Sequence, residues 1–499
     1  MNKKITLIAP PWYSVGNIPY LSANLGLGYI ASYLETYGHK VQIIDALAEG
    51  LDNSFEVWSY GRKIVQTGLS YEEIVQRIDP DTEIIGITCP FTMFAQIVKD
   101  LAHIIKRSFP HINIVLGGVY PSTMPEHALT EDVDYVVQGE GEIPLLQLLD
   151  GIDPHHIKGL VFRGKNHIIN NGSSQEIADL DQIPFPARHL LPMDKYLLFS
   201  SRGTTNQRTV NIITSRGCPF NCDFCSVHPI FGHNWRFRSP GNVLEEIRLL
   251  ITDYDITHIE FEDDNLTLNK DRARIIFHGL AMLSKDLKKD ITWAANNGVR
   301  VDRLDRDLLV KMKNSGCVGL GLGVESGDPV TLNKMNKKID SLDKVLEIAE
   351  ICKELKLPTT AFMIVGHPAE TEEGFYRSLD FFMKLKILGV SNFPVHIIKA
   401  YPGTNLYEDC REKGYLVHSE LTHTRNIEGW PRLNRRNTDI VTEHFTAKDI
   451  LNRRDFAHKK LNPIGFYSEK YPGIFSLYRK IKPLIPEKLR KKILYLVRR

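Results

Sequence analysis

The sequence has no long hydrophobic segment. Among its 499 residues, no run of about 18 apolar residues could span a membrane. The apolar run near the N-terminus ends at Pro10-Pro11 and is too short for the hydrophobic region of a signal peptide. We therefore expect a soluble protein that is cytoplasmic, with peripheral membrane contact as the alternative.

Charge of one sign is not in excess. The chain has 62 Lys and Arg against 60 Asp and Glu, which gives a net charge of +2. This balance gives no reason to expect nucleic acid as a partner. The composition, 42% hydrophobic and 24% charged, is that of a globular protein. A chain of this length predicts two or three domains.

Cysteine is scarce and unevenly distributed. Three of the seven cysteines, Cys218, Cys222 and Cys225, lie in the stretch GCPFNCDFC, and no fourth follows nearby. This crowding favours a reduced intracellular protein with a metal site over a disulfide scaffold. The spacing suits zinc or an iron–sulfur cluster. Zinc would need a fourth ligand, which His228 could supply, whereas a 4Fe–4S cluster on three cysteines keeps one iron open for a substrate.

Strand and helix patterns alternate over residues 1–150. The alternation predicts a doubly wound parallel sheet of the flavodoxin or Rossmann type, with any ligand at the carboxyl ends of its strands. No G-x-G-x-x-G follows the first strand, so a dinucleotide site is not expected. Glycines after the later strands would let a bulky ligand approach the backbone. A domain of this fold without a ligand is the alternative. The predicted strands are 4–10, 40–46, 83–90, 113–119 and 135–141, and the clearest helices are 25–38 and 94–107.

The alternation resumes over residues 205–405, after a proline-containing connector at 151–204. About six β/α units predict a parallel-stranded barrel, or part of one, with its chemistry at the carboxyl ends of the strands. The cysteine-rich loop directly follows the first of these strands. Residues 406–499 are expected to form a small, mostly helical C-terminal region.

The stretch SRGCPFNCDFCSV resembles the signature of the radical S-adenosylmethionine (SAM) superfamily, C-x3-C-x-Φ-C, whose aromatic position Φ is Phe224 here. The resemblance implies that the three cysteines hold a 4Fe–4S cluster and that the open iron binds SAM. One electron, delivered by an external donor of the flavodoxin or ferredoxin type, would then cleave SAM to methionine and a 5′-deoxyadenosyl radical. Phe224 would lie near the adenine.

Further stretches at predicted strand ends resemble the same family. They are THIEFEDDN, GLGLGVESG and FMIVGHPAET, at the ends of the second, fourth and fifth barrel strands. As alternatives, the acidic pair in the first stretch could cap a helix, and the glutamate of the second could be a surface carboxylate. The residues that the resemblance places at SAM, besides Phe224, are Glu262, Asp263, Asp264, Glu325, Ser326 and Gly366.

A doubly wound domain ahead of such a barrel resembles the cobalamin-binding subgroup of the family, the class B methyltransferases. In that subgroup cobalamin lies across the strand ends, between the two domains. The D-x-H-x-x-G of histidine-ligating cobalamin proteins is absent after the first strand. No histidine is therefore expected below the cobalt, which residues 88–93 would cover instead. The residues that the resemblance places at cobalamin are Pro11, Thr88, Gly117, Gly118, Gly139 and Glu140.

The implied activity is methylation of an unactivated carbon. Methylcobalamin would supply the methyl group, and the adenosyl radical would abstract a hydrogen atom from the substrate. Cyclisation, oxidation or carbon–carbon coupling with the same cofactors is the nearest alternative. A non-catalytic zinc-binding protein is an alternative of another class.

The last segment, 478–499, carries nine Lys and Arg against one Glu, with apolar residues on one helical face. This pattern is typical of a helix that lies on an anionic membrane surface, and of solvated surface helices as well. Membrane contact would favour a lipid or another hydrophobic substrate over a water-soluble small molecule.

Overall fold

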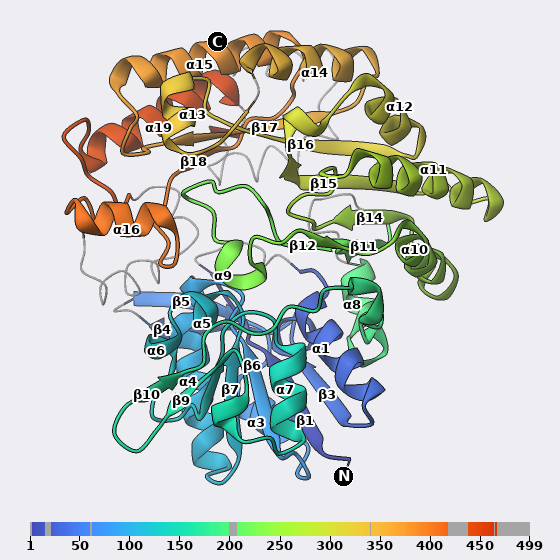
Figure 1. Cartoon of the computed structure of the whole chain (residues 1–499), viewed down its shortest axis with the longest axis vertical. Helices are drawn as coiled ribbons and strands as arrows, with labels where there is room; N and C mark the ends of the chain where they lie inside the picture. The colour runs from blue at the N-terminus through green and yellow to red at the C-terminus, as the bar shows by residue number, and fades with distance from the viewer. Residues whose placement is uncertain are drawn as a thin grey trace.

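The computed structural model describes residues 2–14, 21–59, 62–198, 207–339, 341–417, 438–463 and 465–466. It forms two α/β units, one built by the N-terminal part of the chain and one by the part beyond residue 207 (Figure 1). Helix α9 (His228–Phe231) and strand β12 (Ser215–Arg216) lie where the two units meet (Figure 1).

The first unit contains a seven-stranded sheet in which the five strands that come first in the chain are parallel to one another. Strands such as KITLIA form a parallel sheet because their residues are apolar on both faces and both faces are covered. The strand order is β10 (Ile168–Asn170), β9 (Leu160–Arg163), β8 (Tyr135–Val137), β7 (Asn113–Gly117), β6 (Ile84–Thr88), β1 (Lys4–Ala9) and β3 (Lys40–Asp45).

Helices cover both faces of this sheet. Alternate residues of β1 point to opposite faces, so that Leu7 packs with helices α1 (Leu25–Thr36) and α7 (Glu142–Leu149). Ile8 packs instead with α3 (Tyr71–Arg77) and α4 (Ala95–Ser108). The core on the α1 face continues without a break into the core of the second unit. The two units are therefore joined by apolar packing.

Two parts of the first unit are absent from the sequence-based prediction. One is an antiparallel sheet of β2 (Trp12–Ser14), β5 (Arg62–Thr67) and β4 (Ser54–Ser59), of which β4 and β5 follow α2 (Ala46–Glu49). The other is the pair β9–β10, which extends the main sheet with antiparallel strands. The segment 151–204 is thus more than a connector, since it adds these strands and α8 (Met193–Leu198). The boundaries at residues 150 and 204 stay a prediction.

The second unit confirms the predicted partial barrel. Its six strands are all parallel and pair in chain order. The strands are β11 (Thr209–Ile212), β14 (His258–Phe261), β15 (Thr292–Val299), β16 (Cys317–Glu325), β17 (Thr359–Val365) and β18 (Val395–Ile397). The helices between them are α10 (Pro240–Tyr254), α11 (Lys270–Asp286), α12 (Arg306–Asn314), α13 (Pro329–Lys334), α14 (Leu342–Glu354) and α15 (Glu372–Ile387).

The described C-terminal part contains two helices, α16 (Asn405–Glu412) and α19 (Ala447–Leu461). Helix α19 packs on β17 and β18. Within the described ranges, no helix has both the length and the apolar character that crossing a membrane requires. The basic segment 478–499 lies outside the described residues.

Candidate active site

The loop that carries Cys218, Cys222 and Cys225, called the cluster loop below, runs from β12 to α9. Asp223, in the middle of this loop, is hydrogen-bonded to three segments that follow other strands of the barrel. Its backbone N–H donates to the carbonyl of Met335 at 3.0 Å, and its carbonyl accepts from the N–H of Leu406 at 2.9 Å. Its carboxylate Oδ2 lies 2.8 Å from Nε2 of buried His367. Because these partners follow β16, β17 and β18, the loop is held across the mouth of the barrel.

The three thiols fit a cluster better than a single ion. Within the described ranges, no three His, Cys, Asp or Glu side chains converge as ligands of one metal ion would. Cysteines of a 4Fe–4S cluster bind different irons, so their sulfurs need not converge. Burial raises the pKa of the Cys225 thiol to about 12 and also raises that of Cys222. Bound iron would hold both as thiolates.

His228, the fourth ligand that a zinc site would need, is engaged elsewhere. Its Nε2 lies 3.1 Å from the carbonyl oxygen of Cys218, so this nitrogen donates to the backbone. Its ring stacks on that of His233 with 3.8 Å between centroids. The geometry therefore favours three cysteine ligands and an open iron over a closed zinc site.

Asn265 contacts the cysteines, although sequence reasoning missed it. Its buried side-chain amide donates from Nδ2 to Sγ of Cys218 at 2.8 Å. The only sequence signal was its place directly after the acidic pair at the end of β14. Hydrogen bonds to cluster sulfurs set the reduction potential, because they stabilise the more negative, reduced cluster.

Replacing Asn265 with alanine is expected to make the midpoint potential of the cluster more negative. A hydrogen bond worth about 1 kcal/mol corresponds to at most about 40 mV for a one-electron couple. Spectroelectrochemical titration measures the shift. Asn297→Ala is the matched control, since its amide donates to Glu262 at 2.8 Å and not to sulfur. Equal potentials in wild type and Asn265→Ala would contradict this role.

Among the acidic residues after β14, Asp263 faces the protein interior. Its carboxylate accepts from the backbone N–H of Thr214 at 3.1 Å, from the Thr214 hydroxyl at 2.6 Å and from the Ser215 hydroxyl at 2.5 Å. These hydrogen bonds hold in place Thr214 and Ser215, which lead into the loop that carries the cysteines. Asp264 lies near Cys225, and burial, with a smaller contribution from Asp263, raises its pKa to about 7. Assignment of either carboxylate to SAM stays a prediction.

Glu325 and Ser326, the predicted SAM residues at the end of β16, have different side-chain partners. Glu325 has a left-handed backbone with φ of 68°, and its carboxylate accepts from Nζ of Lys337 at 3.0 Å. Both charges act on Cys222, which places them beside the cluster loop. The Ser326 hydroxyl lies 2.6 Å from that of Ser378, on α15, and is buried.

Gly366 also has a left-handed backbone, with φ of 87°, and it packs closely on α19. A Cβ at this position would lie 2.8 Å from Cδ1 of Ile450. Phe224 is partly buried and packs against the common core. The roles of Phe224, Ser326 and Gly366 at SAM stay predictions.

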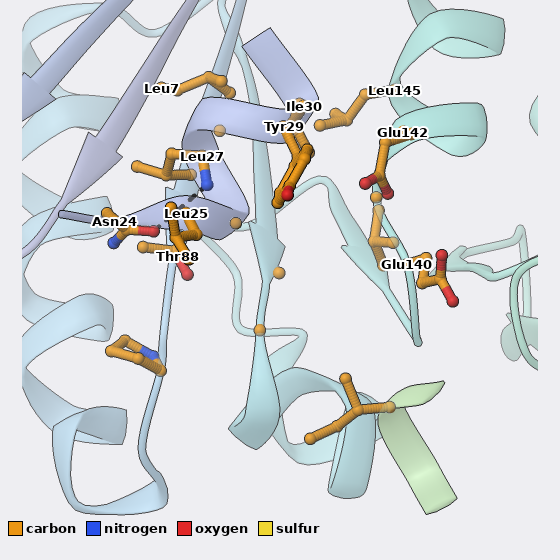
Figure 2. Close-up of a pocket in the computed structure, with 18 of the residues that line it drawn as sticks. Leu7, Asn24, Leu25, Leu27, Tyr29, Ile30, Thr88, Glu140, Glu142 and Leu145 are labelled. Carbon is orange, nitrogen blue, oxygen red and sulfur yellow. Dashed lines mark hydrogen bonds between the residues drawn. The ribbon is translucent and has the colours of Figure 1, made fainter. Parts of the chain in front are cut away.

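A cavity with about 1170 Å³ of unfilled space, part of it open to solvent, lies at the carboxyl ends of the first sheet (Figure 2). Thr88, Gly117, Gly118, Gly139 and Glu140, which the resemblance places at cobalamin, all line it, and their contact with cobalamin stays a prediction. Pro11 is buried but does not line it. Residues that sequence reasoning missed come from the start of α1 and from α7, and include Asn24, Leu25, Leu27, Tyr29, Ile30, Glu142 and Leu145.

Gly117 faces open space in this cavity, and Gly118 packs closely against the backbone beside it. A Cβ added at Gly117 would meet no atom within 4 Å, so this position faces open space. Gly118 has φ of 105°, and a Cβ there would lie 2.7 Å from the carbonyl oxygen of Cys89. Among the described residues that line the cavity there is no histidine. The open space at Gly117 therefore allows a bulky ligand such as cobalamin to approach the backbone.

The second unit closes the cavity with charged and apolar residues. Arg216 of β12 donates from Nη1 to Glu140 at 2.6 Å and from Nη2 to Glu142 at 2.8 Å. Arg236 donates to the other oxygen of Glu140, and all four side chains are almost fully buried. Burial alone lowers the pKa of Arg216, but Glu142 and Glu140 outweigh it, so the pKa is raised. This ion cluster joins the two units at the cavity.

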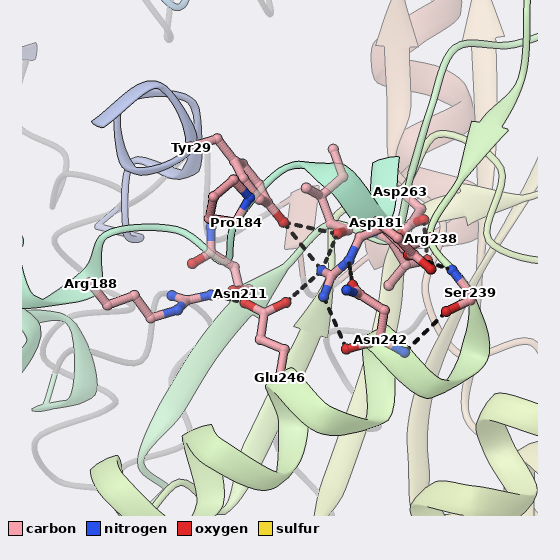
Figure 3. A network of polar contacts seen from close by, with 12 residues as sticks. Tyr29, Asp181, Pro184, Arg188, Asn211, Arg238, Ser239, Asn242, Glu246 and Asp263 are labelled. Atoms are coloured by element: carbon pink, nitrogen blue, oxygen red, sulfur yellow. Dashed lines mark hydrogen bonds and ion pairs between the residues drawn. The ribbon is translucent and has the colours of Figure 1, made fainter. Parts of the chain in front are cut away.

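A second buried network lies beside it (Figure 3). Glu246 accepts from Nη2 of Arg188 at 3.0 Å and from Nη1 of Arg238 at 2.5 Å. Arg238 also donates at 3.2 Å to the hydroxyl of Tyr29, which lines the cavity from α1. Burial, followed by the charge of Glu246, raises the pKa of Tyr29 to about 12, so the phenol remains neutral. The wall of the cavity is thus fixed to the barrel.

Comparisons with known proteins agree with this architecture. Residues 12–149 match the B12 binding domain family, and residues 212–382 match the radical SAM superfamily. The chain is 32% identical over 455 residues to an uncharacterized methyltransferase of Pyrococcus horikoshii, covering 90% of each protein. It is 28% identical to cytidylyl-2-hydroxyethylphosphonate methyltransferase of Streptomyces wedmorensis, covering 84% of each.

A solved structure shows the same fold. The cobalamin-dependent SAM radical enzyme OxsB with aqua-cobalamin bound superposes with a TM-score of 0.71 at 17% identity, covering 99% of this chain and 70% of OxsB. Together with the two family matches and the methyltransferase relatives, the fold and the site leave no support for the zinc-binding alternative. This chain belongs to the cobalamin-dependent radical SAM methyltransferases, enzymes that use a 4Fe–4S cluster, SAM and cobalamin.

Proposed function

We propose that this enzyme methylates an unactivated carbon of a small organic or lipid-like molecule held between its two units. The observation that carries the proposal is the lining of the cavity by both flanks of the cluster loop. Ile213 and Arg216 precede the loop, and Ile230 and Phe231 follow it. When bound, the cluster and SAM together would supply a carbon-centred radical, and cobalamin would supply a transferable methyl group.

The chain's own residues would position the reactants and exclude water. Leu7, Leu27, Ile30 and Leu145 make much of the cavity wall apolar. An apolar wall keeps solvent away from reactive species and strengthens the few polar contacts within it. Because the ion cluster and the common core hold the units together, the spacing between the two cofactor sites is fixed.

We further propose that Asp264 and the Glu325–Lys337 pair contact SAM. Asp264 follows β14 and lies near Cys225, which supports it as the partner of the methionine amino group of SAM bound at the cluster. Lys337 offers a buried cation for the methionine carboxylate, and Glu325 holds that cation in place at 3.0 Å.

Gly117→Leu is expected to block cobalamin binding without unfolding the protein. A Cβ at this position would meet no atom within 4 Å, so the leucine side chain would extend into open space in the cavity and compete with the ligand. We expect a loss of bound cobalamin of at least about tenfold, which corresponds to about 1.4 kcal/mol of lost binding free energy. Absorbance of the reconstituted protein reports the cobalamin content.

Gly118→Ala is the matched comparison for this prediction. Its Cβ would clash with the carbonyl of Cys89, so we expect a lower melting temperature, which Gly117→Leu should not show. Full cobalamin content in Gly117→Leu would show that the ligand lies elsewhere.

The proposed function is tested with isotope-labelled SAM. Reconstituted enzyme, a reductant and SAM with a ¹³C-methyl group are incubated anaerobically with aqueous and lipid fractions of a cell extract. Label on carbon in a product is the expected result. Label in the lipid fraction would support a lipid-like substrate and peripheral membrane contact through 478–499, and label in the aqueous fraction would support a small cytoplasmic substrate. If SAM is cleaved but no product in either fraction carries the label, the result would contradict methyl transfer.

A further inference from the structure

A group of cations borders the exposed tip of the cluster loop. The basic rim, defined here as Arg303, Lys334 and Lys338, comes from the segments that follow β15 and β16. Lys334 and Lys338 are exposed, and the Arg303 side chain is 41% exposed. Within the described ranges, neither lysine ammonium is paired with a carboxylate. This surface therefore keeps its positive charge, although the chain as a whole is nearly neutral.

Direct contacts join the basic rim to the loop. The guanidinium of Arg300 lies 3.5 Å from the ring centroid of Phe220, and that of Arg303 lies 5.7 Å from it. The side-chain amide of Asn336 donates to the carbonyl of Asn221 at 2.8 Å, two residues after Lys334 and two before Lys338. The guanidinium of Arg300 also donates to the carbonyl of Lys338. The basic segments thus contact Phe220 and Asn221, which lie between Cys218 and Cys222.

The tip of the cysteine loop is exposed between two of the cysteines. Pro219 and Asn221 are exposed, and they lie between Cys218 and Cys222. Cys222 and Cys225 themselves are mostly enclosed, and their pKa values are raised chiefly by burial. A carrier that docks at this tip would therefore lie within a few residues of two of the cysteines.

We propose that the basic rim is the docking surface of an acidic one-electron carrier protein that reduces the cluster. The inference rests on the proposed function, because only a redox-active cluster needs such a partner. Two carboxylates lie near the rim. Asp302 is paired with Arg300 at 3.0 Å and with Arg303 at 3.4 Å, and Glu325 is paired with Lys337 at 3.0 Å. The exposed ammonium groups of Lys334 and Lys338 are therefore the positive charges that these two carboxylates do not balance. Complementary charge would steer an acidic protein to the loop tip. One electron leaves the reduced carrier and enters the oxidised cluster, with no proton transferred.

The test compares a protein reductant with a small one. The double variant Lys334→Glu/Lys338→Glu is loaded with cluster, and its reduction is followed by stopped-flow bleaching of the cluster absorbance. With reduced bacterial flavodoxin at low salt, the rate should fall at least about tenfold, and 1 M salt should remove the difference. With dithionite, which needs no docking surface, the rate should not change.

A matched control uses exposed lysines at the other end of the barrel. Lys285 and Lys353 stand in the last turns of α11 and α14, which lead into the amino ends of strands. Lys285→Glu/Lys353→Glu changes the net charge equally and should leave the flavodoxin rate unaltered. An unchanged flavodoxin rate in the rim variant, or an equal fall in both double variants or with dithionite, would overturn the proposal. Failure of the wild-type protein to take up a cluster would instead overturn the proposed function.

Discussion

Replacing Cys222 with alanine is expected to remove the cluster and reduce 5′-deoxyadenosine formation to the background of iron-free protein. The loop provides three thiols, and the described part of the chain offers no group of side chains that could take over as metal ligands. With two thiolates left, a cluster that already lacks a fourth protein ligand would lose a second attachment. Iron and sulfide analysis after anaerobic reconstitution measures the loss.

Cys352→Ala is the matched control for this prediction. Cys352 is buried on α14, and burial alone raises its pKa to about 12, so it behaves as a small apolar side chain. Its replacement should keep both the cluster and SAM cleavage. Retention of iron and of 5′-deoxyadenosine formation by Cys222→Ala would contradict the assignment of the three-cysteine loop.

Replacing Arg216 with methionine is expected to destabilise the protein by about 3–5 kcal/mol, because it leaves a buried carboxylate without its partner. Glu140 would keep Arg236, but Glu142 would lose the guanidinium that lies 2.8 Å away. The stacking of Arg216 on the rings of Tyr29 and Phe231, at 5.2 and 5.8 Å, would also be lost. Since these residues line the cavity, cobalamin binding should weaken as well.

Thermal melting of single and double variants separates the ion pair from simple packing loss. Glu142→Gln in the Arg216→Met background removes the unpaired charge, so it should recover part of the lost melting temperature. Arg248→Met serves as the control, because Arg248 pairs with Glu245 on the surface and should show no measurable change. No loss of stability in Arg216→Met, or no recovery in the double variant, would show that the buried pair does not hold the units together.

The regular β/α units were predictable because their pattern is local. Strands such as β1 and β17 are apolar runs bounded by proline or glycine, and helices such as α4 show their apolar face at a regular spacing. The small sheet of β2, β4 and β5 was not predicted, because β2 has only three residues and the strands of the β4–β5 hairpin mix polar with apolar residues. The hairpin of β9 and β10 was missed because its strands have only four and three residues.

The cluster cysteines were predictable because their spacing within one loop carries the chemistry. The ion cluster around Arg216 was not, because Arg216 and Glu142 are 74 residues apart and no local pattern links them. Asn265 was missed because an amide after an acidic pair has many local explanations. Asp263 shows the reverse case, since its position at a strand end suggests SAM while its carboxylate is bonded to Thr214 and Ser215.

The most direct test of the account is the composition and chemistry of the anaerobically reconstituted chain. We expect about four iron and four sulfide per chain, one cobalamin, and 5′-deoxyadenosine once reductant and SAM are added. Zinc bound at Cys218, Cys222 and Cys225, or a reduced iron-loaded protein that leaves SAM intact, would contradict the open-iron site on which the account depends.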